Sequence, residues 1–272
     1  GEQTAALADR TAQQAALDAA RADVAKKKGL FSPAKIVDCV QAALDQPFAQ
    51  GLATERELFV QCLNSPQRAG LVHAFFAERE VTKSPETQSS QPRPFQKVGV
   101  IGGGTMGAGI AVALLDGGLQ VTMIERDDAA LALGQSRVAK VYDGLIKKGR
   151  LSEEGKAAIL TRFNGSTAYD ALADADIVVE AVFEDMGVKK AVFAELDRVC
   201  KKGAVLATNT SYLDIDEIAG SVSRPQDVVG LHFFSPANIM KLLEIVVPAK
   251  VSADVVATGF ALAKKLKKVP VR

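Results

Sequence analysis

The stretch that most constrains the fold is KVGVIGGGTMGAGIAVALLDGG, residues 97–118, where a β-rich run leads into a glycine-rich loop and then into a helical pattern. The loop has the spacing Gly102-x-Gly104-x-x-Gly107, which lets the backbone turn tightly and approach a pyrophosphate. The anion would rest on the backbone amides and the positive dipole end of the following helix. Glycine-rich turns are common, but the flanking strand and helix favour a dinucleotide site over a turn that binds nothing.

An acidic residue indicates which dinucleotide is bound. The second β-rich run, QVTMIE, ends in Glu125, about 20 residues after the first glycine, where a carboxylate accepts hydrogen bonds from the adenosine ribose hydroxyls. The same charge repels the 2′-phosphate of NADP, so the expected cofactor is NAD. Arg126 follows directly and would accommodate such a phosphate, and the loop alone does not exclude FAD.

From residue 95 onward, β-rich runs alternate with helical segments. The runs are KVGVI, QVTMIE, DIVVEAV, AVLATN and VVGLHFF. Strands that alternate with helices of this length form a parallel sheet with helices on both faces. The apolar character of DIVVEAV is typical of a strand that is buried on both sides. The sequence therefore predicts an α/β domain with a Rossmann-type, doubly wound and mostly parallel sheet.

The N-terminal part has a different, all-helical pattern. Alanine-rich stretches such as TAQQAALDAARADVAKK are interrupted at Gly29 and Pro47. The following stretch, TKSPETQSSQPRP, is polar and contains three prolines, which is typical of a linker. We therefore expect a helical segment over residues 1–81, a linker over residues 82–94 and the dinucleotide-binding domain over residues 95–272.

Composition excludes several classes of function. The chain has 272 residues, of which 48% are hydrophobic, and a net charge of +1, so nothing in the charge balance favours nucleic acid or a membrane surface. No run approaches the roughly 18 apolar residues of a membrane-spanning helix. The cysteines, Cys39, Cys62 and Cys200, are isolated and odd in number. They fit neither a disulfide framework nor a zinc site, so we predict no metal and a reducing compartment.

Polar residues follow three of the predicted strands. They are Glu180, Glu184 and Asp185 after DIVV, Thr208, Asn209, Thr210 and Ser211 after AVLA, and His232 and Ser235 after VVGL. Taken singly, each has a structural interpretation, as a helix cap or as a histidine within an apolar core. In doubly wound sheets, however, ligands bind beyond the carboxyl ends of the strands, where the strand order reverses. Three such ends next to the glycine loop favour a single functional site.

Four motifs together resemble the NAD-binding domain of L-3-hydroxyacyl-CoA dehydrogenases, in order and in spacing. They are GGGTMGAGI, DIVVEAVFEDMGVKKAVFAELD, NTSYLDIDEIA and GLHFFSPANIMKLLEI. Upstream, PAKIVDCVQAALDQPFAQGLATERELF resembles the C-terminal helices of the crotonase-like hydratase half in bifunctional enzymes of fatty-acid β-oxidation. The resemblance implies NAD-dependent oxidation of an L-3-hydroxyacyl-CoA to a 3-ketoacyl-CoA.

The resemblance also implies roles for the residues around the histidine. His232 would be the general base that takes the proton of the substrate 3-hydroxyl, and Glu244 would orient the imidazole. Ser211 would hydrogen-bond near the substrate oxygen and the nicotinamide, with Asn209 supporting its turn. Lys148 matches a position that contacts coenzyme A, although lysines at the end of a helix are also common as solvated, dipole-favoured residues.

The cofactor contacts follow from the same resemblance. Gly102, Gly104, Thr105, Met106 and Gly107 would lie at the pyrophosphate, Glu125 at the ribose, and Val182, Phe183, Glu184, Lys189 and Ser211 along the nicotinamide half, with Ser235 as a further cofactor contact. Many members of the family have asparagine where this chain has Ser235. A serine still donates a hydrogen bond, so we expect a retuned contact, not a lost one.

The chain departs from the family in extent. The all-helical C-terminal domain is expected after KKVPV, and the catalytic region of the hydratase is expected before the first helices, so the resemblance implies a middle piece of a longer polypeptide. Two alternatives to a working dehydrogenase follow. One is a module that binds NAD without turnover. The other is a relative of the lysine-dependent β-hydroxyacid dehydrogenases, which lack the HFF-x-P run followed by glutamate.

Partners and location are also implied by the resemblance. The expected ligand is an acyl-CoA substrate, and the whole protein is expected to be oligomeric or to associate with a thiolase. We expect the bacterial cytoplasm as its location, with the peroxisomal matrix as the alternative in a eukaryote. Nucleic acid and a membrane span are not expected.

Overall fold

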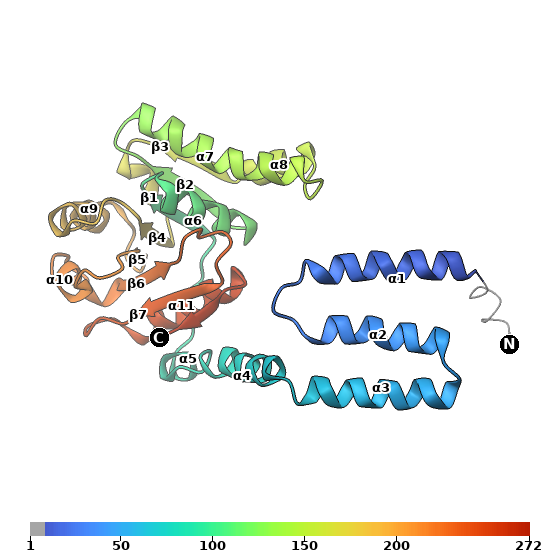
Figure 1. Cartoon of the computed structure of the whole chain (residues 1–272). Coiled ribbons are helices and arrows are strands. Elements are labelled where there is room, and N and C mark those ends of the chain that lie inside the picture. Colours follow the sequence, from blue (N-terminus) through green and yellow to red (C-terminus); the bar gives the residue numbers. More distant parts are fainter. Residues whose placement is uncertain (1–8) are drawn as a thin grey trace. The chain divides into compact units, whose positions relative to one another are not determined.

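The computed structural model describes residues 9–272, which divide between Arg79 and Glu80 into a helical unit and an α/β unit (Figure 1). The helical unit consists of α1 (Arg10–Ala25), α2 (Ser32–Asp45), α3 (Phe48–Leu63) and most of α4 (Pro66–Glu80). Asp9 caps α1 by accepting the backbone N–H groups of Thr11 and Ala12, which satisfies two amides that have no partner inside the helix.

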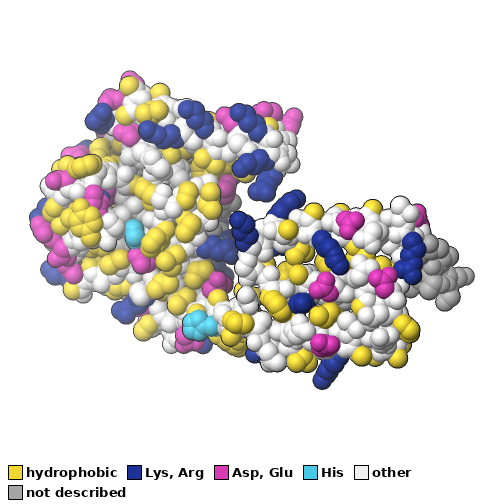
Figure 2. Space-filling view, viewed as in Figure 1, with side chains coloured by type: hydrophobic (Ala, Val, Ile, Leu, Met, Phe, Trp, Pro, Cys, Tyr) yellow, Lys and Arg dark blue, Asp and Glu magenta, His cyan; other side chains and the backbone are white. Residues whose placement is uncertain are grey.

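The helical unit buries few of its apolar side chains. Within α1–α4 the buried residues are Leu17, Val37 and Ala42. Large apolar residues remain exposed, and hydrophobic side chains are visible on these helices in Figure 2. Leu63, Leu71, Val72, Phe75 and Phe76 are among the residues that line an open groove of about 440 Å³ in this unit. Apolar surfaces of this kind mark sites of interaction.

The α/β unit is built on an eight-stranded sheet with the order β3-β2-β1-β4-β5-β6-β7-β8. Its strands are β1 (Lys97–Ile101), β2 (Gln120–Ile124), β3 (Phe163–Ser166), β4 (Ile177–Glu180), β5 (Val205–Thr208), β6 (Val228–Phe233), β7 (Leu242–Val246) and β8 (Val269–Val271). Strands β1 to β6 are mutually parallel, whereas β7 runs antiparallel to β6 and β8 parallel to β7. The predicted Rossmann-type, mostly parallel sheet is confirmed.

Helices cover both faces of this sheet. One core cluster joins the strands to α6 (Thr105–Asp116), α7 (Asp128–Lys147), α8 (Glu153–Leu160) and α11 (Ala253–Lys265). A second cluster joins them to α9 (Met186–Val199) and α10 (Ile215–Ala219). Because β4 and β5 lie between these two layers, every one of their residues is buried. No helix within residues 9–272 is long and apolar enough to cross a bilayer.

Aspartate side chains fix where three of the helices after the strands begin. Asp127, Asp185 and Asp214 each accept a backbone N–H from the first turn of α7, α9 and α10, which follow β2, β4 and β5. Each helix therefore begins within a few residues of the end of its strand. The loops at the carboxyl edge of the sheet are therefore short and held in place.

The segment expected to be a linker, residues 82–94, differs from that expectation. It contains a short helix, α5 (Pro85–Ser89), which packs against α11 and belongs to the α/β unit. Arg93 then anchors the segment: its Nε lies 2.7 Å from Asp254 and its Nη1 lies 2.7 Å from Asp227. The backbone N–H of Arg93 also donates to the Thr258 hydroxyl at 2.9 Å. A single residue, Arg93, makes both ion pairs and this backbone hydrogen bond. A polar, proline-rich composition does not reveal such contacts.

We predict that Arg93→Ala destabilises the α/β unit by about 2 kcal/mol, because it removes the nearer of the two cations beside the buried Asp227 and leaves only Arg224, at 3.6 Å. The measurement is urea-induced unfolding followed by circular dichroism. The matched control is Arg198→Ala, because Arg198 is largely exposed and pairs with exposed carboxylates. Equal losses of stability in the two variants would contradict the anchoring role of Arg93.

A second prediction concerns pH. The hydrogen bond from Arg93 is the main cause that lowers the pKa of Asp254. Asp254 therefore contributes stability that is present above its ordinary pKa of about 3.9 and is lost as the pH falls through its lower value in the folded protein. We expect the difference in free energy of unfolding between the parent and Arg93→Ala to shrink between about pH 6 and about pH 3. A difference that stays constant over this range would refute the linkage.

Candidate active site

The glycine loop between β1 and α6 has a geometry that only glycine permits at two positions. Gly102 has a φ of +95°, and a Cβ on it would lie 2.8 Å from the Ala181 carbonyl oxygen. A Cβ on Gly107 would lie 1.8 Å from the Gly102 carbonyl oxygen, far inside van der Waals contact. The first turn of α6 therefore packs directly on the loop backbone.

The start of α6 is suited to an anion. Gly104 is the N-cap residue, and no side chain caps this helix. The first amides of a helix have no partner within it, so here they are available to a ligand. A Cβ on Gly104 would meet nothing within 4 Å, so the backbone at this position borders open space. These features fit the pyrophosphate of a dinucleotide.

Glu125 is held beside this loop. Its Oε1 accepts the Gly103 N–H at 2.7 Å, and its Oε2 accepts the Arg126 N–H at 3.1 Å. The fixed carboxylate retains lone pairs for ribose hydroxyls. The Arg126 guanidinium pairs with Asp127 at 3.0 Å and is thereby engaged on the outside of the loop. Arg137 adds a further hydrogen bond, from Nη1 to the Gly103 carbonyl at 2.8 Å.

The register of the sheet brings the predicted strand ends to one edge. Ile101 of β1 lies opposite both Ile124 of β2 and Glu180 of β4, and Glu180 lies opposite Thr208 of β5. Thr208 in turn lies opposite Gly230, two residues before the histidine on β6. Neighbouring strands are about 4.8 Å apart, so roughly 14 Å separates β1 from β6. The strand order reverses at β1, which is where ligands bind in such sheets.

The histidine and its glutamate face each other across two antiparallel strands. His232 of β6 lies opposite Glu244 of β7, and its Nδ1 lies 2.7 Å from Oε2 of Glu244. A carboxylate only accepts hydrogen bonds, so this contact favours the tautomer with the proton on Nδ1, which leaves a lone pair on Nε2. The imidazole is 18% exposed, and its ring contacts Phe234 with centroids 4.6 Å apart.

Asn209 connects β5 to the strand that carries the histidine. Its backbone N–H donates to the Glu180 carbonyl at 2.8 Å, and its Oδ1 accepts the Phe233 N–H at 2.8 Å. The amide thus fixes the backbone immediately after His232. The expected role of Asn209, support of the turn that carries Ser211, stays a prediction.

A polar network connects the ends of β4 and β5 with α9. Lys189 is 1% exposed, and its Nζ lies 2.8 Å from Glu180 and 3.1 Å from Glu184. Glu184 accepts hydrogen bonds from the Thr210 hydroxyl and, at 2.9 Å, from the Ser211 N–H. Burial alone would raise the pKa of Glu184, but the hydrogen bonds from Thr210, Ser211 and Lys189 outweigh it and lower the pKa.

The cofactor contact expected for Lys189 stays a prediction. Its side chain is buried and paired with the buried Glu180 and the partly exposed Glu184. Val182 and Phe183 do lie on the turn after β4, and Phe183 is 80% exposed there. Ser235 is exposed just beyond β6.

Lys148 lies away from the other predicted site residues. It caps the C-terminal end of α7, a helix of 20 residues that begins beside Glu125. Such a helix is about 30 Å long, so Lys148 lies far from the ribose end of the loop. Its contact with coenzyme A stays a prediction.

Two residues named at the strand ends, Glu180 and Thr208, had been assigned no individual role. They form the buried part of the network, with the Thr208 hydroxyl donating to Glu180 at 2.6 Å. Arg137 was not predicted at all. It supports the loop from the middle of α7, and nothing in its sequence context indicates this.

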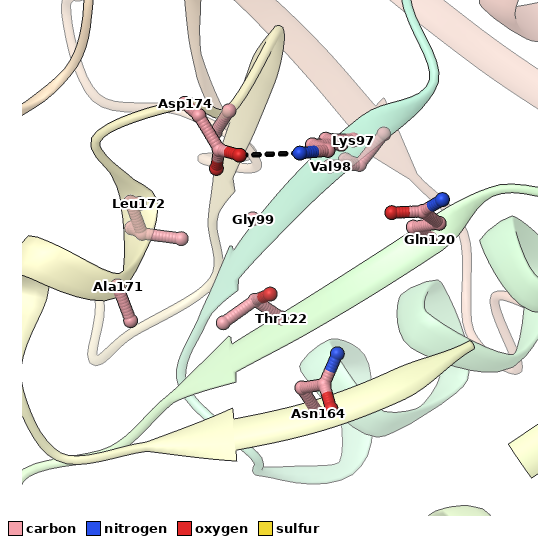
Figure 3. Close-up of a pocket in the computed structure, with 10 residues that line it drawn as sticks. Lys97, Val98, Gly99, Gln120, Thr122, Asn164, Ala171, Leu172 and Asp174 are labelled. Atoms are coloured by element: carbon pink, nitrogen blue, oxygen red, sulfur yellow. Dashed lines mark hydrogen bonds and ion pairs between the residues drawn. The ribbon is translucent and has the colours of Figure 1, made fainter. Parts of the chain in front are cut away.

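A small cavity of about 150 Å³ lies away from this site (Figure 3). Lys97 and Gln120, the first residues of β1 and β2, line it together with Thr122 and Asn164, and Lys97 pairs with Asp174 at its rim. The cavity therefore opens near the amino ends of the strands, opposite the glycine loop.

Comparison with known proteins adds the family. Residues 97–272 match the family described as "3-hydroxyacyl-CoA dehydrogenase, NAD binding domain". The peroxisomal bifunctional enzyme of Cavia porcellus is 44% identical over 249 residues, which cover 89% of this chain and 34% of that protein. The fatty acid oxidation complex subunit alpha of Shewanella frigidimarina is 36% identical over 257 residues, covering 93% of this chain and 36% of that protein.

A solved structure agrees with this match. The (S)-3-hydroxybutyryl-CoA dehydrogenase of Ralstonia eutropha aligns with a TM-score of 0.64 and 39% identity, over 65% of this chain and 63% of that chain. The chain spans about a third of the length of the curated relatives described above. The matched domain binds NAD, so the cofactor expected from the glycine loop and Glu125 is confirmed.

We predict that Gly104→Ala folds as stably as the parent but binds NADH at least about tenfold more weakly, because its methyl group occupies the space through which the pyrophosphate approaches. Gly107→Ala should lose both stability and affinity. Calorimetric titration with NADH and thermal unfolding measure the two effects. Gly144→Ala is the control, since its added Cβ also meets nothing within 4 Å but lies on α7. Unchanged affinity in Gly104→Ala would contradict the assignment.

Proposed function

The chain belongs to the 3-hydroxyacyl-CoA dehydrogenase family, and from this premise we propose that it contributes to the NAD-dependent oxidation of an L-3-hydroxyacyl-CoA to a 3-ketoacyl-CoA in fatty-acid β-oxidation. The supporting observation is the His232–Glu244 pair on the same edge of the sheet as the glycine loop. A general base and a dinucleotide site at one edge are what alcohol oxidation by hydride transfer requires.

His232 performs the proton transfer in this proposal. Its Nε2 carries the free lone pair, so it accepts the proton of the substrate 3-hydroxyl as the C3–O bond becomes a carbonyl. NAD, when bound, accepts the hydride from C3. Glu244 keeps the ring in the required tautomer and stabilises the imidazolium after the proton arrives. The hydrogen bond from Phe233 to Asn209 keeps the strand, and with it the ring, in position.

The remaining contacts are proposed on the same basis. Ser211 hydrogen-bonds the substrate oxygen and the nicotinamide end, and Lys148 contacts the coenzyme A portion. Met106 and Gly107 lie at the pyrophosphate, and Glu125 binds the adenosine ribose. Val182, Phe183, Glu184, Lys189 and Ser235 border the nicotinamide half. Acyl-CoA is thus the proposed substrate class.

Location and assembly are proposed as well. Among the relatives are a peroxisomal enzyme and a bacterial subunit of a complex. We propose a reducing compartment, the bacterial cytoplasm or the peroxisomal matrix, since the cysteines are free in the part of the chain that the structure describes. Association with further copies or with a thiolase is part of the same proposal.

A second candidate is that the 272-residue chain binds NAD without turnover. Phe183, Tyr212 and Ile239 are large, highly exposed apolar residues that follow β4, β5 and β6 at the edge of the proposed site. Apolar side chains around a reaction site are usually covered, because excluding water strengthens its electrostatic interactions. The chain would then bind the cofactor, and a covering element would be needed for the reaction.

The lysine-dependent β-hydroxyacid dehydrogenases receive less support. A lysine that serves as acid and base must reach the substrate with a free ammonium or amine. Lys189, on the first turn of α9, is buried and paired with two carboxylates. His232 is the better candidate because its Nε2 is free.

We predict that His232→Ala lowers kcat with acetoacetyl-CoA and NADH by about 10²–10⁴-fold and leaves the affinity for NADH unchanged, since the ring acts on the substrate proton. NADH consumption is followed by absorbance. His73→Ala is the control, because His73 is the other histidine and lies exposed on α4 of the helical unit. An unchanged rate in His232→Ala would refute the base assignment.

The same assay separates the two candidates. The 272-residue chain is compared with a version extended by the region that follows the matched stretch in the relatives. Turnover only in the extended version supports the need for a covering element, and equal turnover in both would exclude it.

A further inference from the structure

We infer that Lys189 and Glu180 are positioning residues that act through Glu184 to hold Ser211 at the nicotinamide end of the site. This inference rests on the proposed function, because that function places Ser211 beside the nicotinamide. It goes beyond it by assigning the buried pair a positioning role, separate from the cofactor contact expected of Lys189.

Glu180 is the fixed point of this arrangement. It is the last residue of β4 and is 0% exposed. Its Oε1 accepts the Val182 N–H at 2.8 Å and lies 2.8 Å from Nζ of Lys189, and its Oε2 accepts the Thr208 hydroxyl at 2.6 Å. A buried carboxylate is tolerated only when it is paired and hydrogen-bonded in this way. The ends of β4 and β5 and the start of α9 are thereby joined.

Lys189 connects Glu180 to Glu184. Its Nζ lies 3.1 Å from Oε2 of Glu184, so that one ammonium serves two carboxylates. The other oxygen of Glu184, Oε1, accepts the Thr210 hydroxyl, the Ser211 N–H at 2.9 Å and the Ser211 hydroxyl at 3.4 Å. Each oxygen of Glu184 therefore has a separate task. One is held by the buried lysine, and the other holds the turn that carries Ser211.

Stability alone does not require this second task. Lys189 and Glu180 already satisfy one another in the interior, whereas Glu184 is partly exposed and Ser211 is exposed. An exposed serine whose backbone and hydroxyl are both bound by a fixed carboxylate has a defined hydroxyl direction. A defined direction matters only if a ligand meets that hydroxyl, and groups placed in advance bind with less loss of entropy.

The test separates the nicotinamide end of the ligand from the rest. The 272-residue chain and its variants are titrated calorimetrically with NADH and with ADP-ribose, which lacks the nicotinamide. Lys189→Met removes the shared cation, and Thr210→Val removes the hydroxyl that donates to Glu184 and accepts the Leu213 N–H, while leaving the buried charges paired. Lys190→Met is the matched control, because the neighbouring Lys190 forms a more exposed pair with Glu217.

We expect both Lys189→Met and Thr210→Val to weaken NADH binding by about tenfold and to change ADP-ribose binding by less than about twofold. Lys190→Met should leave both affinities within about twofold of the parent. Thermal unfolding identifies a variant that fails to fold, and Thr210→Val keeps the test open if Lys189→Met does so. Rescue by Thr210→Ser, which restores the hydroxyl, would distinguish the hydrogen bond from a change in packing.

The inference is overturned if NADH and ADP-ribose lose affinity equally, or if folded Thr210→Val binds NADH like the parent. A failure of the proposed function gives a different result. In that case the extended parent does not consume NADH with acetoacetyl-CoA, whereas the ratio of the two affinities still reports on the nicotinamide end.

Discussion

The close approach of Gly107 to the Gly102 carbonyl is the constraint on which the site depends. It seats the first turn of α6 on the loop that leaves β1, so that the loop, the helix amides and Glu125 form one rigid surface. The parallel register then fixes the positions of the ends of β4, β5 and β6 relative to this surface. The distance between the cofactor loop and the histidine is thus set by the spacing of strands, which side-chain packing can hardly change.

The reversal of direction at β7 supplies what the parallel strands lack. Parallel strands place only their carboxyl ends at the edge of the sheet where the site lies. β7 runs antiparallel to β6 and therefore crosses this region in the opposite direction. Glu244 therefore reaches His232 from the middle of a strand, and its position is as rigid as the ladder itself. A carboxylate on a loop would orient the imidazole with less certainty.

The sequence allowed the parallel sheet, the loop and the His232–Glu244 pair to be predicted, because periodicity, glycine spacing and family motifs are local signals. It did not reveal that Lys189 is buried, since a lysine beside Lys190 at the start of a helix is usually solvated. Nor did it reveal β3 and β7, which are short or lie beside turns. Contacts such as that of Arg137 with the loop join residues far apart in the chain, and no local pattern carries them.

The contacts of Arg93 place the start of the α/β unit before its first strand. A polypeptide cut at residue 95, where the β-rich pattern starts, would lack the guanidinium that lies between Asp227 and Asp254. Asp254 would then lose its guanidinium partner, Asp227 would keep only Arg224, and α11 would lose the helix that packs on it. A piece that keeps both α5 and the contacts of Arg93 therefore starts before the capping residue Ser84, within what composition alone would assign to a spacer.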